Sequence, residues 1–331
     1  MKKFLRILKW VGIVVVVVLV GVVSTVLLRK NRTYDAPYPD IHASKDSAVI
    51  ARGKYLVNGP AHCAHCHTPN DQMSKVDAGE IVPMTGGHKF EFGSVAIMYT
   101  PNLTSDKETG IGAYSDGELA RALRYGVKRD GTPLFDIMPF YDISENDLTA
   151  IVSYLRTLEP VKSEVPKGSR SFLGDALYAF GAIAPVGLKT ENRPAILKTI
   201  NPDTTAEYGK YLANYVGNCV GCHTDRNLQT GEFTGEPFAG GLKLPCETDP
   251  NLMLVSPNIT FDPETGRLAN WDEEAFIKRF RMGRLVKESM MPWGSYSRMS
   301  DMELKAIYRY LKTVKQVKRE NGPPVIKTAD L

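Results

Sequence analysis

The sequence predicts a mainly helical protein in which two tandem domains follow an apolar N-terminal helix. Three observations support this. Residues 10–28 carry no charge, the chain after residue 45 shows the same landmarks twice in the same order, and each repeat ends in a capped segment with apolar residues at helical spacing. At 331 residues the chain can form two domains of ordinary size. The expected segments are an anchor (1–32), a first domain (33–160), a linker (161–200), a second domain (201–318) and a polar tail (319–331).

The apolar stretch from Trp10 to Leu28 is long enough to span a membrane. As a helix of 19 residues it would extend about 28 Å, close to the roughly 30 Å of a hydrocarbon core. The alternative is a cleaved secretory signal, whose apolar region runs to about 15 residues and ends at a small-x-small site. Residues 24–28 offer no such site. We therefore expect an uncleaved single span that contacts membrane lipid through residues 10–28.

Basic residues beside this stretch account for the formal charge of +4. Residues 1–32 hold seven of the 41 lysines and arginines and no acid, which leaves 34 basic against 37 acidic residues in the remainder. Four of the seven precede the span and three follow it, so the positive-inside rule favours a cytoplasmic N-terminus only slightly. The mildly acidic remainder lacks the basic surface that nucleic acids require, and we expect no nucleic-acid partner.

The internal repeat defines the two domains. The tetrapeptide Gly-Lys-Tyr-Leu occurs at residues 53–56 and again at 209–212, and a Gly-Gly pair follows in each repeat. We expect Gly53 and Gly209 to let a first helix cross closely over a closing helix, with the repeat tyrosines in the core. The further matched landmarks are Gly86-Gly87 with Gly240-Gly241, Pro101-Asn102-Leu103-Thr104 with Pro257-Asn258-Ile259-Thr260, Glu108-Thr109-Gly110 with Glu264-Thr265-Gly266, and Tyr154 with Tyr310.

Each repeat is expected to contain two further helices. One runs over 115–126 in the first repeat and over 271–283 in the second, with acids at its start and a glycine at its end. The closing helix begins after Ser144 or Ser300, both favourable N-cap residues. The second repeat is three residues longer before its closing helix, so we expect the first domain's site to be more exposed. The apolar stretch 172–188 of the linker is expected to pack across the domains or to touch the membrane.

Two pentapeptides carry the chemistry: Cys63-Ala64-His65-Cys66-His67 and Cys219-Val220-Gly221-Cys222-His223. Two thiols separated by two residues can add to the two vinyl groups of one haem, and the adjacent histidine is then held where it can bind the iron. A thioredoxin-like pair would need only one site, and a four-cysteine zinc site would not place a histidine after each pair. The sequence therefore predicts two covalently bound haems c, attached through Cys63, Cys66, Cys219 and Cys222, with His67 and His223 as axial ligands.

The sixth iron ligand of each haem is expected to be a methionine, because a thioether raises the potential of an electron carrier. Met138 and Met291 are the matched pair: each lies about 70 residues beyond its haem histidine, is followed by proline and precedes the closing helix. We expect the carbonyls of Pro101 and Pro257 to bind the other nitrogen of each histidine ring. The methionines without a repeat partner are interpreted as core residues, with Met290 the nearest competitor as a ligand: Met84, Met98, Met282, Met290 and Met299.

Three residues near the motifs lack a repeat partner. His62 and His65 lie before and between the first pair of thiols, and we expect them to face solvent. Cys246 has no counterpart in the first repeat. It could be a free buried thiol, a contact with a partner or an alternative iron ligand.

Together these motifs resemble membrane-anchored multihaem cytochromes c, in particular the cytochrome c subunit of bacterial membrane-bound alcohol, aldehyde and gluconate dehydrogenases. That family carries three haem sites and an anchor near the C-terminus, whereas this sequence has two sites and an apolar N-terminus. The resemblance implies two class I cytochrome c-like helical domains, each wrapping a haem. It also implies haem attachment outside the cytoplasmic membrane, which places the domains in the periplasm, and a redox partner such as a dehydrogenase or respiratory complex.

The expected function is single-electron transfer between a respiratory donor, a dehydrogenase or quinol-oxidising complex, and an acceptor, an oxidase or soluble cytochrome. Two six-coordinate haems leave no open iron position, so we expect no catalytic residue in the chain. The alternative is a dihaem redox enzyme resembling a peroxidase or a thiosulfate dehydrogenase, for which Cys246 and His88 are the candidate residues. A haem-based sensor is a third possibility, but no output domain follows Val317.

Overall fold

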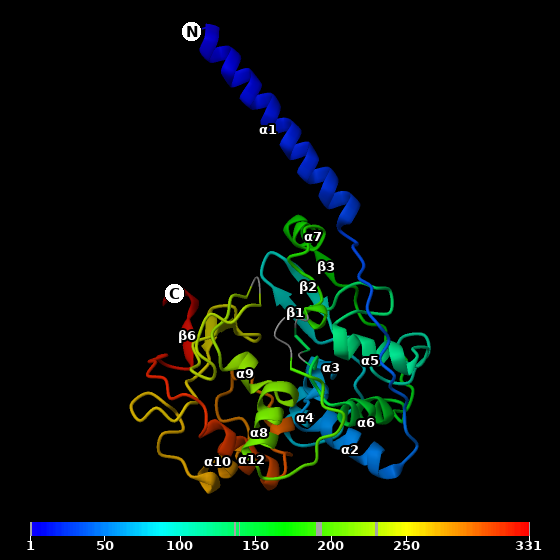
Figure 1. The fold of residues 1–331 in the computed structure, drawn as a ribbon, viewed down its shortest axis with the longest axis vertical. Helices are drawn as coiled ribbons and strands as arrows, with labels where there is room; N and C mark the ends of the chain where they lie inside the picture. Colours follow the sequence, from blue (N-terminus) through cyan, green and yellow to red (C-terminus); the bar gives the residue numbers. More distant parts are fainter. Residues whose placement is uncertain (1, 136, 139, 190–193, 229–230, 331) are drawn as a thin grey trace.

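A computed structural model describes residues 2–135, 137–138, 140–189, 194–228 and 231–330. Helix α1 (Lys2–Arg29) projects from a body formed by the rest of the chain (Figure 1). Its side chains are exposed along almost its whole length, and Val26 is the buried exception. Among the described residues it is the one helix long and apolar enough to cross a membrane.

Five helices and two strands of the first repeat follow, with a short 3-10 turn between α3 and α4. Their order matches the order of the sequence landmarks. The elements are α2 (Ser47–Asn58), α3 (Cys63–His67), η1 (Asn70–Gln72), α4 (Met73–Asp77), β1 (Lys89–Phe92), β2 (Ala96–Tyr99), α5 (Asp116–Tyr125) and α6 (Glu145–Leu155).

The second repeat forms a corresponding series with a short helix, α11, before its closing helix, but its described residues contain no counterpart of η1 and α4. Its first helix ends in a π-helical turn, η3. The elements are α8 (Ala206–Tyr211), η3 (Leu212–Val216), α9 (Cys219–Cys222), β4 (Lys243–Pro245), β5 (Leu252–Val255), α10 (Glu273–Arg281), α11 (Trp293–Tyr296) and α12 (Asp301–Leu311).

The predicted helix starts are confirmed. Ser115 caps α5 by accepting from the N–H of Glu118, whose carboxylate accepts in return from the Ser115 N–H. Ser144 and Ser300 cap α6 and α12 in the same way through their hydroxyls. Asp272 caps α10, one residue after the expected start of that helix. Each cap satisfies an N–H group that the helix leaves without a partner.

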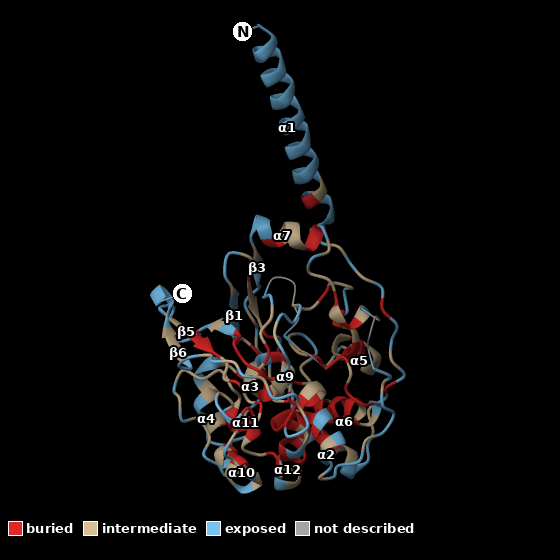
Figure 2. Ribbon diagram, turned by 60° about the vertical axis from the view of Figure 1, so that its left-hand side comes forward, coloured by how far each residue is buried: buried red, intermediate tan, exposed pale blue. Residues whose placement is uncertain are grey.

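The predicted glycine crossings are also confirmed. A side chain at Gly53 would collide with the carbonyl of Ala150 in α6, and one at Gly209 would collide with that of Ala306 in α12. The paired helices α2 and α6, and α8 and α12, therefore pack backbone to backbone. Their apolar faces merge into one core that runs through both halves, and Figure 2 shows its buried segments around α6, α11 and α12.

A small antiparallel sheet completes each half and was not expected from the sequence. Strands β1 and β2 pair with Lys89 opposite Tyr99, and β4 and β5 pair with Lys243 opposite Val255. The third strand begins fourteen residues after the closing helix in both halves. These strands are β3 (Ser169–Arg170), which pairs with β2, and β6 (Val325–Lys327), which pairs with β5.

The segments predicted to be a linker and a polar tail therefore also form part of the two domains. Residues 161–170 and 319–327 return to the sheet of their own half, because Val161 and Val317 are each held by a buried asparagine of that half. The rest of the linker forms α7 (Phe172–Ala179), which contacts α1, and the turn η2 (Val186–Leu188). Its last described part binds the start of α6 through the carbonyls of Leu197 and Lys198.

Candidate haem-binding sites

The four motif cysteines lie on two short helices, α3 and α9. In each helix the paired thiols are three residues apart and so lie on the same face. All four are free thiols, and burial raises the pKa of Cys63, Cys66 and Cys219 to about 12. The thiols are therefore protonated at neutral pH and placed so that both of a pair can reach one ligand. This is the arrangement that thioether attachment of a haem requires.

The two motif histidines present one ring nitrogen to a protein carbonyl. Nδ1 of His67 lies 3.0 Å from the carbonyl oxygen of Pro101, and Nδ1 of His223 lies 3.0 Å from that of Pro257. The predicted carbonyl partners are confirmed. Burial lowers the pKa of His67 to about 4, so its ring is neutral, and the carbonyl assigns the hydrogen to Nδ1. Within the described part of the chain no hydrogen bond involves Nε2 of either ring, so its lone pair can bind a metal.

The Pro-Asn-x-Thr landmark explains how those carbonyls are held. The Asn102 amide donates to the carbonyl of Val161 over 2.8 Å, and its oxygen accepts from the N–H of Thr104 over 2.9 Å. Asn258 makes the same two bonds, to Val317 over 2.8 Å and from Thr260 over 3.0 Å. Both asparagines are almost fully buried. Each one ties the loop that carries the proline to the segment that leaves the closing helix.

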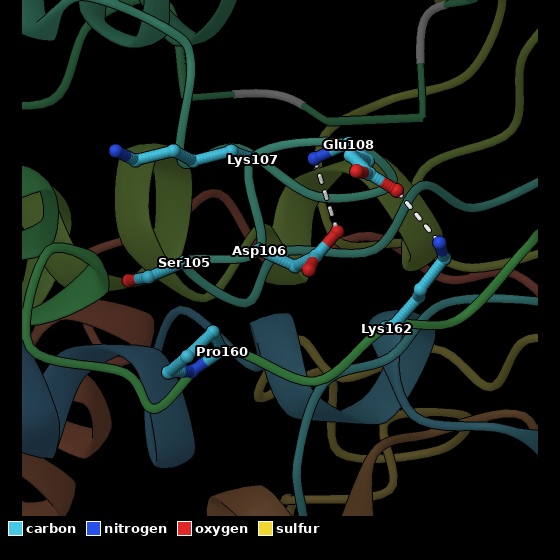
Figure 3. Close-up of a pocket in the computed structure, with 6 residues that line it drawn as sticks. All are labelled: Ser105, Asp106, Lys107, Glu108, Pro160 and Lys162. Carbon is cyan, nitrogen blue, oxygen red and sulfur yellow. Dashed lines mark hydrogen bonds and ion pairs between the residues drawn. The ribbon is translucent and has the colours of Figure 1, made fainter.

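The Glu-Thr-Gly landmark closes the same loop. Asp106 accepts from the N–H and hydroxyl of Thr109 over 2.6 and 2.8 Å, and Asp262 accepts from Thr265 over 2.8 and 2.7 Å. Figure 3 shows this turn in the first half, where Glu108 also pairs with Lys162 over 2.7 Å. The shallow surface depression there is lined by Ser105, Lys107 and Pro160 among others. The two carboxylates beside it, Asp106 and Glu108, are already paired within the turn and with Lys162, and we interpret the depression as structural.

One glycine completes each site. The N–H of Gly86 donates to the carbonyl of His67, and that of Gly240 to the carbonyl of His223, both over 2.8 Å. Both glycines have positive φ, +74° and +69°. A side chain at Gly86 would meet the backbone of Pro101 at 2.6 Å, and one at Gly240 would meet that of Pro257. Only glycine fits between the histidine and the proline that orients it.

The two predicted methionine ligands occupy matched turns. The N–H of Phe140 donates to the carbonyl of Met138 over 3.0 Å, and that of Trp293 donates to the carbonyl of Met291 over 2.7 Å. Both side chains are half-buried at the edge of the core, while Pro139 lies outside the described residues. Met84 and Met299 are buried as expected, but Met282 is 53% exposed and its interpretation as a core residue is wrong.

Family models match both halves of the chain. The model described as cytochrome c matches residues 50–159, and the model for subunit III of cbb3-type cytochrome c oxidase matches residues 206–311. The chain contains two tandem cytochrome c domains. Two covalently bound haems c belong to these domains, and the paired thiols and neutral histidines described above fit that group.

Curated relatives agree with two cytochrome c domains. The fructose dehydrogenase cytochrome subunit of Gluconobacter japonicus is 27% identical over 91% of this chain and 60% of its own length. The cytochrome c subunit of the quinone alcohol dehydrogenase of Gluconobacter oxydans is 27% identical over 82% and 56%. A diheme cytochrome c-type protein of Cereibacter sphaeroides is 25% identical over 76% and 81%. The chain thus spans about 60% of the length of the two dehydrogenase subunits.

His62 joins the two cytochrome c domains, and the expectation that it faces solvent is wrong. Its ring packs on Tyr296 with centroids 5.5 Å apart, and its Nδ1 lies 3.5 Å from the Tyr296 hydroxyl. That hydroxyl donates to the carbonyl of Gly217, two residues before Cys219. Tyr296 is buried, and burial raises its pKa. One side chain therefore bridges the two haem-attachment segments.

Helix α11, which carries Tyr296, lies in the loop that is three residues longer in the second repeat. It packs on α3 and α4 of the first domain, where a side chain at Gly294 would collide with the backbone of Val76 and Asp77. The longer loop thus covers part of the first domain's attachment segment. In the sequence, only the three-residue insertion indicated this contact. Which surface the longer loop covers depends on how the domains pack.

His65 also lies in this contact region and not in solvent. Its Nδ1 is buried without a hydrogen bond, and burial lowers its pKa to about 4. Asp77 and Arg284, whose charges act on His65, form an ion pair at 2.9 Å between the domains. Both candidates for the enzyme alternative have polar neighbours: Nε2 of His88 lies 3.6 Å from Glu247, and the buried thiol of Cys246 lies 3.3 Å from the hydroxyl of Thr248.

A polar network across the domain interface follows the repeat symmetry. The Tyr211 hydroxyl of the second domain donates to Asp147 over 2.9 Å and accepts from the N–H of Ser144 over 3.2 Å. In the opposite direction the Tyr55 hydroxyl donates to Glu303 and accepts from the N–H of Ser300 over 2.8 Å. These tyrosines were expected to be core residues, and Tyr211 is buried. Their hydroxyls nevertheless bind the N-cap of the other domain's closing helix.

The symmetry is broken by Arg52, whose counterpart in the second repeat is Tyr208. The Arg52 guanidinium binds Asp147 at 2.9 Å and Glu303 at 3.3 Å. The Tyr208 hydroxyl donates to Glu303 over 3.0 Å. The side chains of Asp147 and Glu303 are each 1% exposed. One guanidinium and three tyrosine hydroxyls therefore neutralise and solvate two buried carboxylates, since a buried charge without partners is costly.

Proposed function

We propose that this protein is a membrane-anchored dihaem cytochrome c that transfers single electrons between a respiratory donor and an acceptor. The observation that carries the proposal is the duplication of a complete site: paired thiols, a carbonyl-bound histidine and a Met-Pro turn occur in both domains. Such a site would hold the iron through a histidine and a methionine and would leave no position for a substrate. Intrinsic catalysis is therefore not part of the proposal.

We assign covalent attachment to Cys63 and Cys66 in the first domain and to Cys219 and Cys222 in the second. The axial ligands proposed are His67 with Met138 and His223 with Met291. Haem c supplies a one-electron iron couple when bound. The chain's own residues orient the imidazoles through Pro101 and Pro257 and exclude water from the buried His67.

The proposed topology is a single span through residues 10–28, with the N-terminus in the cytoplasm and the haem domains in the periplasm. The exposed apolar surface of α1 supports a lipid environment for this helix. The haem-binding parts are proposed to be 33–160 and 201–318. Residues 161–200 and 319–331 add the third strand of each sheet and the contact with α1.

A dehydrogenase or respiratory complex is the proposed redox partner. The named relatives that support it are cytochrome subunits of fructose and alcohol dehydrogenases. Electrons from such a donor would enter one haem and leave from the other toward an oxidase or soluble cytochrome. The contact of α3, α9 and Tyr296 supports exchange between the haems, because the two attachment segments meet there.

The absorption spectrum of the reduced, intact protein with carbon monoxide tests the proposal. We expect no change on adding carbon monoxide, because both irons would carry His and Met ligands. Binding by one haem of the unaltered protein would contradict a carrier with two closed sites and favour a dihaem enzyme.

Single methionine variants test the ligand assignment. Met138→Ala and Met291→Ala are each expected to open one haem to carbon monoxide and to lower the midpoint potential of that haem, because the thioether raises it. Met290→Ala tests the neighbouring competitor, and the exposed Met282→Ala is the matched control. Carbon monoxide binding in Met290→Ala but not in Met291→Ala would reassign the second ligand.

A further inference from the structure

Helix α7 presents an apolar face to the outside of the body. Phe172 is 56% exposed, Leu173 49% and Phe180 56%. Phe172, Ala176 and Phe180 are spaced by four residues, as are Leu173 and Leu177, so these five lie on one face. The other side of the helix holds Gly174 and Tyr178, which are buried, and Asp175. An outer face made of large apolar side chains is expected to be covered.

The position of α7 identifies what covers the outer face. The helix packs against the end of α1, where Val26 is the buried residue, and Figures 1 and 2 show it directly beneath that end. Val26 lies inside the apolar stretch of residues 10–28 that would span the bilayer. An element that packs against this end of α1 from the side of the body therefore lies at the depth where acyl chains meet headgroups.

Polar contacts fasten α7 at this depth. The Arg170 guanidinium, just before α7, donates to the carbonyl of Lys30 over 2.9 Å and to the side chain of Asn31 over 3.2 Å. It also pairs with Asp175 of α7 at 2.8 Å and lies over the ring of Tyr178, 4.2 Å from its centroid. The connection between α1 and α7 is thus braced immediately outside the span.

We propose that the outer face of α7, formed by Phe172, Leu173, Ala176, Leu177 and Phe180, is a second membrane contact that inserts into the interfacial region of the bilayer. The end of α1 that α7 contacts also exposes apolar side chains, because Leu27 and Leu28 are 58% and 85% exposed. Arg29 and Lys30 lie beside it at headgroup level, where basic side chains favour anionic lipid.

The consequence is a fixed orientation of the haem domains. One span alone leaves the body free to rotate about the helix axis and to tilt. A second contact beside the span restricts both motions, with α10 and α12 at the end of the body away from α1 (Figure 1). The inference rests on the proposed membrane span of α1 and adds the placement of the body against the bilayer.

Photolabelling from the lipid tests it. The full-length protein would be placed in nanodiscs of phosphatidylcholine and phosphatidylglycerol that contain a lipid with a diazirine near the start of one acyl chain, and adducts would be mapped by mass spectrometry. We expect adducts on residues 10–28 and on residues 172–180. Adducts on α1 alone would overturn the α7 contact while leaving the anchor intact. Adducts on neither segment would overturn the anchor as well.

Two controls separate insertion from mere exposure. Met282 and Leu285 are 53% and 58% exposed and follow α10, at the far end of the body, so they should remain unlabelled. The triple variant Phe172→Ser, Leu173→Ser, Phe180→Ser should lose most adducts on α7 and keep those on α1, whereas Leu285→Ser should change neither. Equal labelling of α7 in the triple variant would contradict insertion.

Discussion

Asn102 and Asn258 support the two proposed haem sites indirectly. Neither is a ligand, yet each holds the loop whose preceding proline orients a haem histidine. The repeat revealed them as landmarks, but their role became clear only from the carbonyls they bind. Their burial means that an alanine there leaves the carbonyl of Val161 or Val317 short of a hydrogen bond.

Asn102→Ala and Asn258→Ala are each expected to destabilise the protein by about 1–3 kcal/mol, the cost of an unsatisfied buried polar group. Each should also shift the midpoint potential of the haem in its own domain, because the histidine loses its fixed carbonyl. Thermal unfolding and redox titration measure the two effects. Asn251→Ala, at an exposed turn, is the control. Equal effects of Asn251→Ala and Asn258→Ala would contradict the role of the asparagine.

Gly86 provides a second test at the residue scale. The φ of Gly86 is positive, and a side chain there would collide with the backbone of Pro101. Gly79 also has a positive φ, +90°, but a side chain there would meet open space. Gly79→Ala should lower the free energy of unfolding by about 1–2 kcal/mol, because alanine is unfavourable in the left-handed conformation. Gly86→Ala should cost clearly more, because the methyl group also displaces the proline. Urea unfolding of both variants decides this, and equal losses would show that the close approach does not matter.

At the scale of elements, each site depends on one turn and one helix cap that recur in both domains. Asp106 and Asp262 each close a Glu-Thr-Gly turn, and the bonds from the N–H and hydroxyl of the threonine hold the pKa of both carboxyls below the usual value. The folded state therefore binds these protons less readily than the unfolded chain does. Their contribution to stability is complete above the unfolded pKa of about 3.9 and is lost as pH falls through the folded pKa.

When the pH is lowered from neutral to 3, the free energy of unfolding is expected to fall less in the double variant Asp106→Asn, Asp262→Asn than in the unaltered protein. An asparagine oxygen still accepts the threonine bonds but does not titrate. Denaturant unfolding at several pH values measures the difference. Asp71→Asn, at an exposed aspartate bound to the amide of Gln72, is the control and should leave the pH dependence unchanged. The same acid sensitivity in the double variant would assign it to other groups.

At the scale of the molecule, the two domains pack as a near-symmetric pair, with the start of each closing helix bound by the other domain's tyrosine. This places α3, α9 and α11 together and brings the haem-attachment segments to one contact. Among the residues that the structure describes, Arg52 is the one cation that reaches both buried carboxylates of the interface. The orientation of the domains therefore depends on a few polar groups as well as on the shared core.

Arg52→Met keeps the volume and removes the charge. It should destabilise the protein by about 3–5 kcal/mol, because Asp147 and Glu303 would remain buried without a cation. Arg309→Met, which removes an exposed partner of Glu273, should cost less than about 1 kcal/mol. Urea unfolding compares the two. If Arg52→Met is no more harmful than Arg309→Met, water or another group must solvate the carboxylates.

The sequence by itself determined the local features and those marked by its repeated landmarks. The spacing of Cys63 and Cys66 follows from one helical turn, the caps at Ser144 and Ser300 from the chemistry of their hydroxyls, and the crossings at Gly53 and Gly209 from the missing side chain. These features need only neighbouring residues or a duplicated pattern. The axial roles of Met138 and Met291 remain predictions from that pattern.

Only the tertiary structure decided how the parts meet. His62 and His65 were expected in solvent, because nothing local indicates that α11 of the other domain covers them. The third strand of each sheet, the carboxylate pair at the interface and the position of α7 beside α1 likewise join residues far apart in the chain. Such contacts depend on the packing of whole surfaces, which a residue pattern along the chain does not encode.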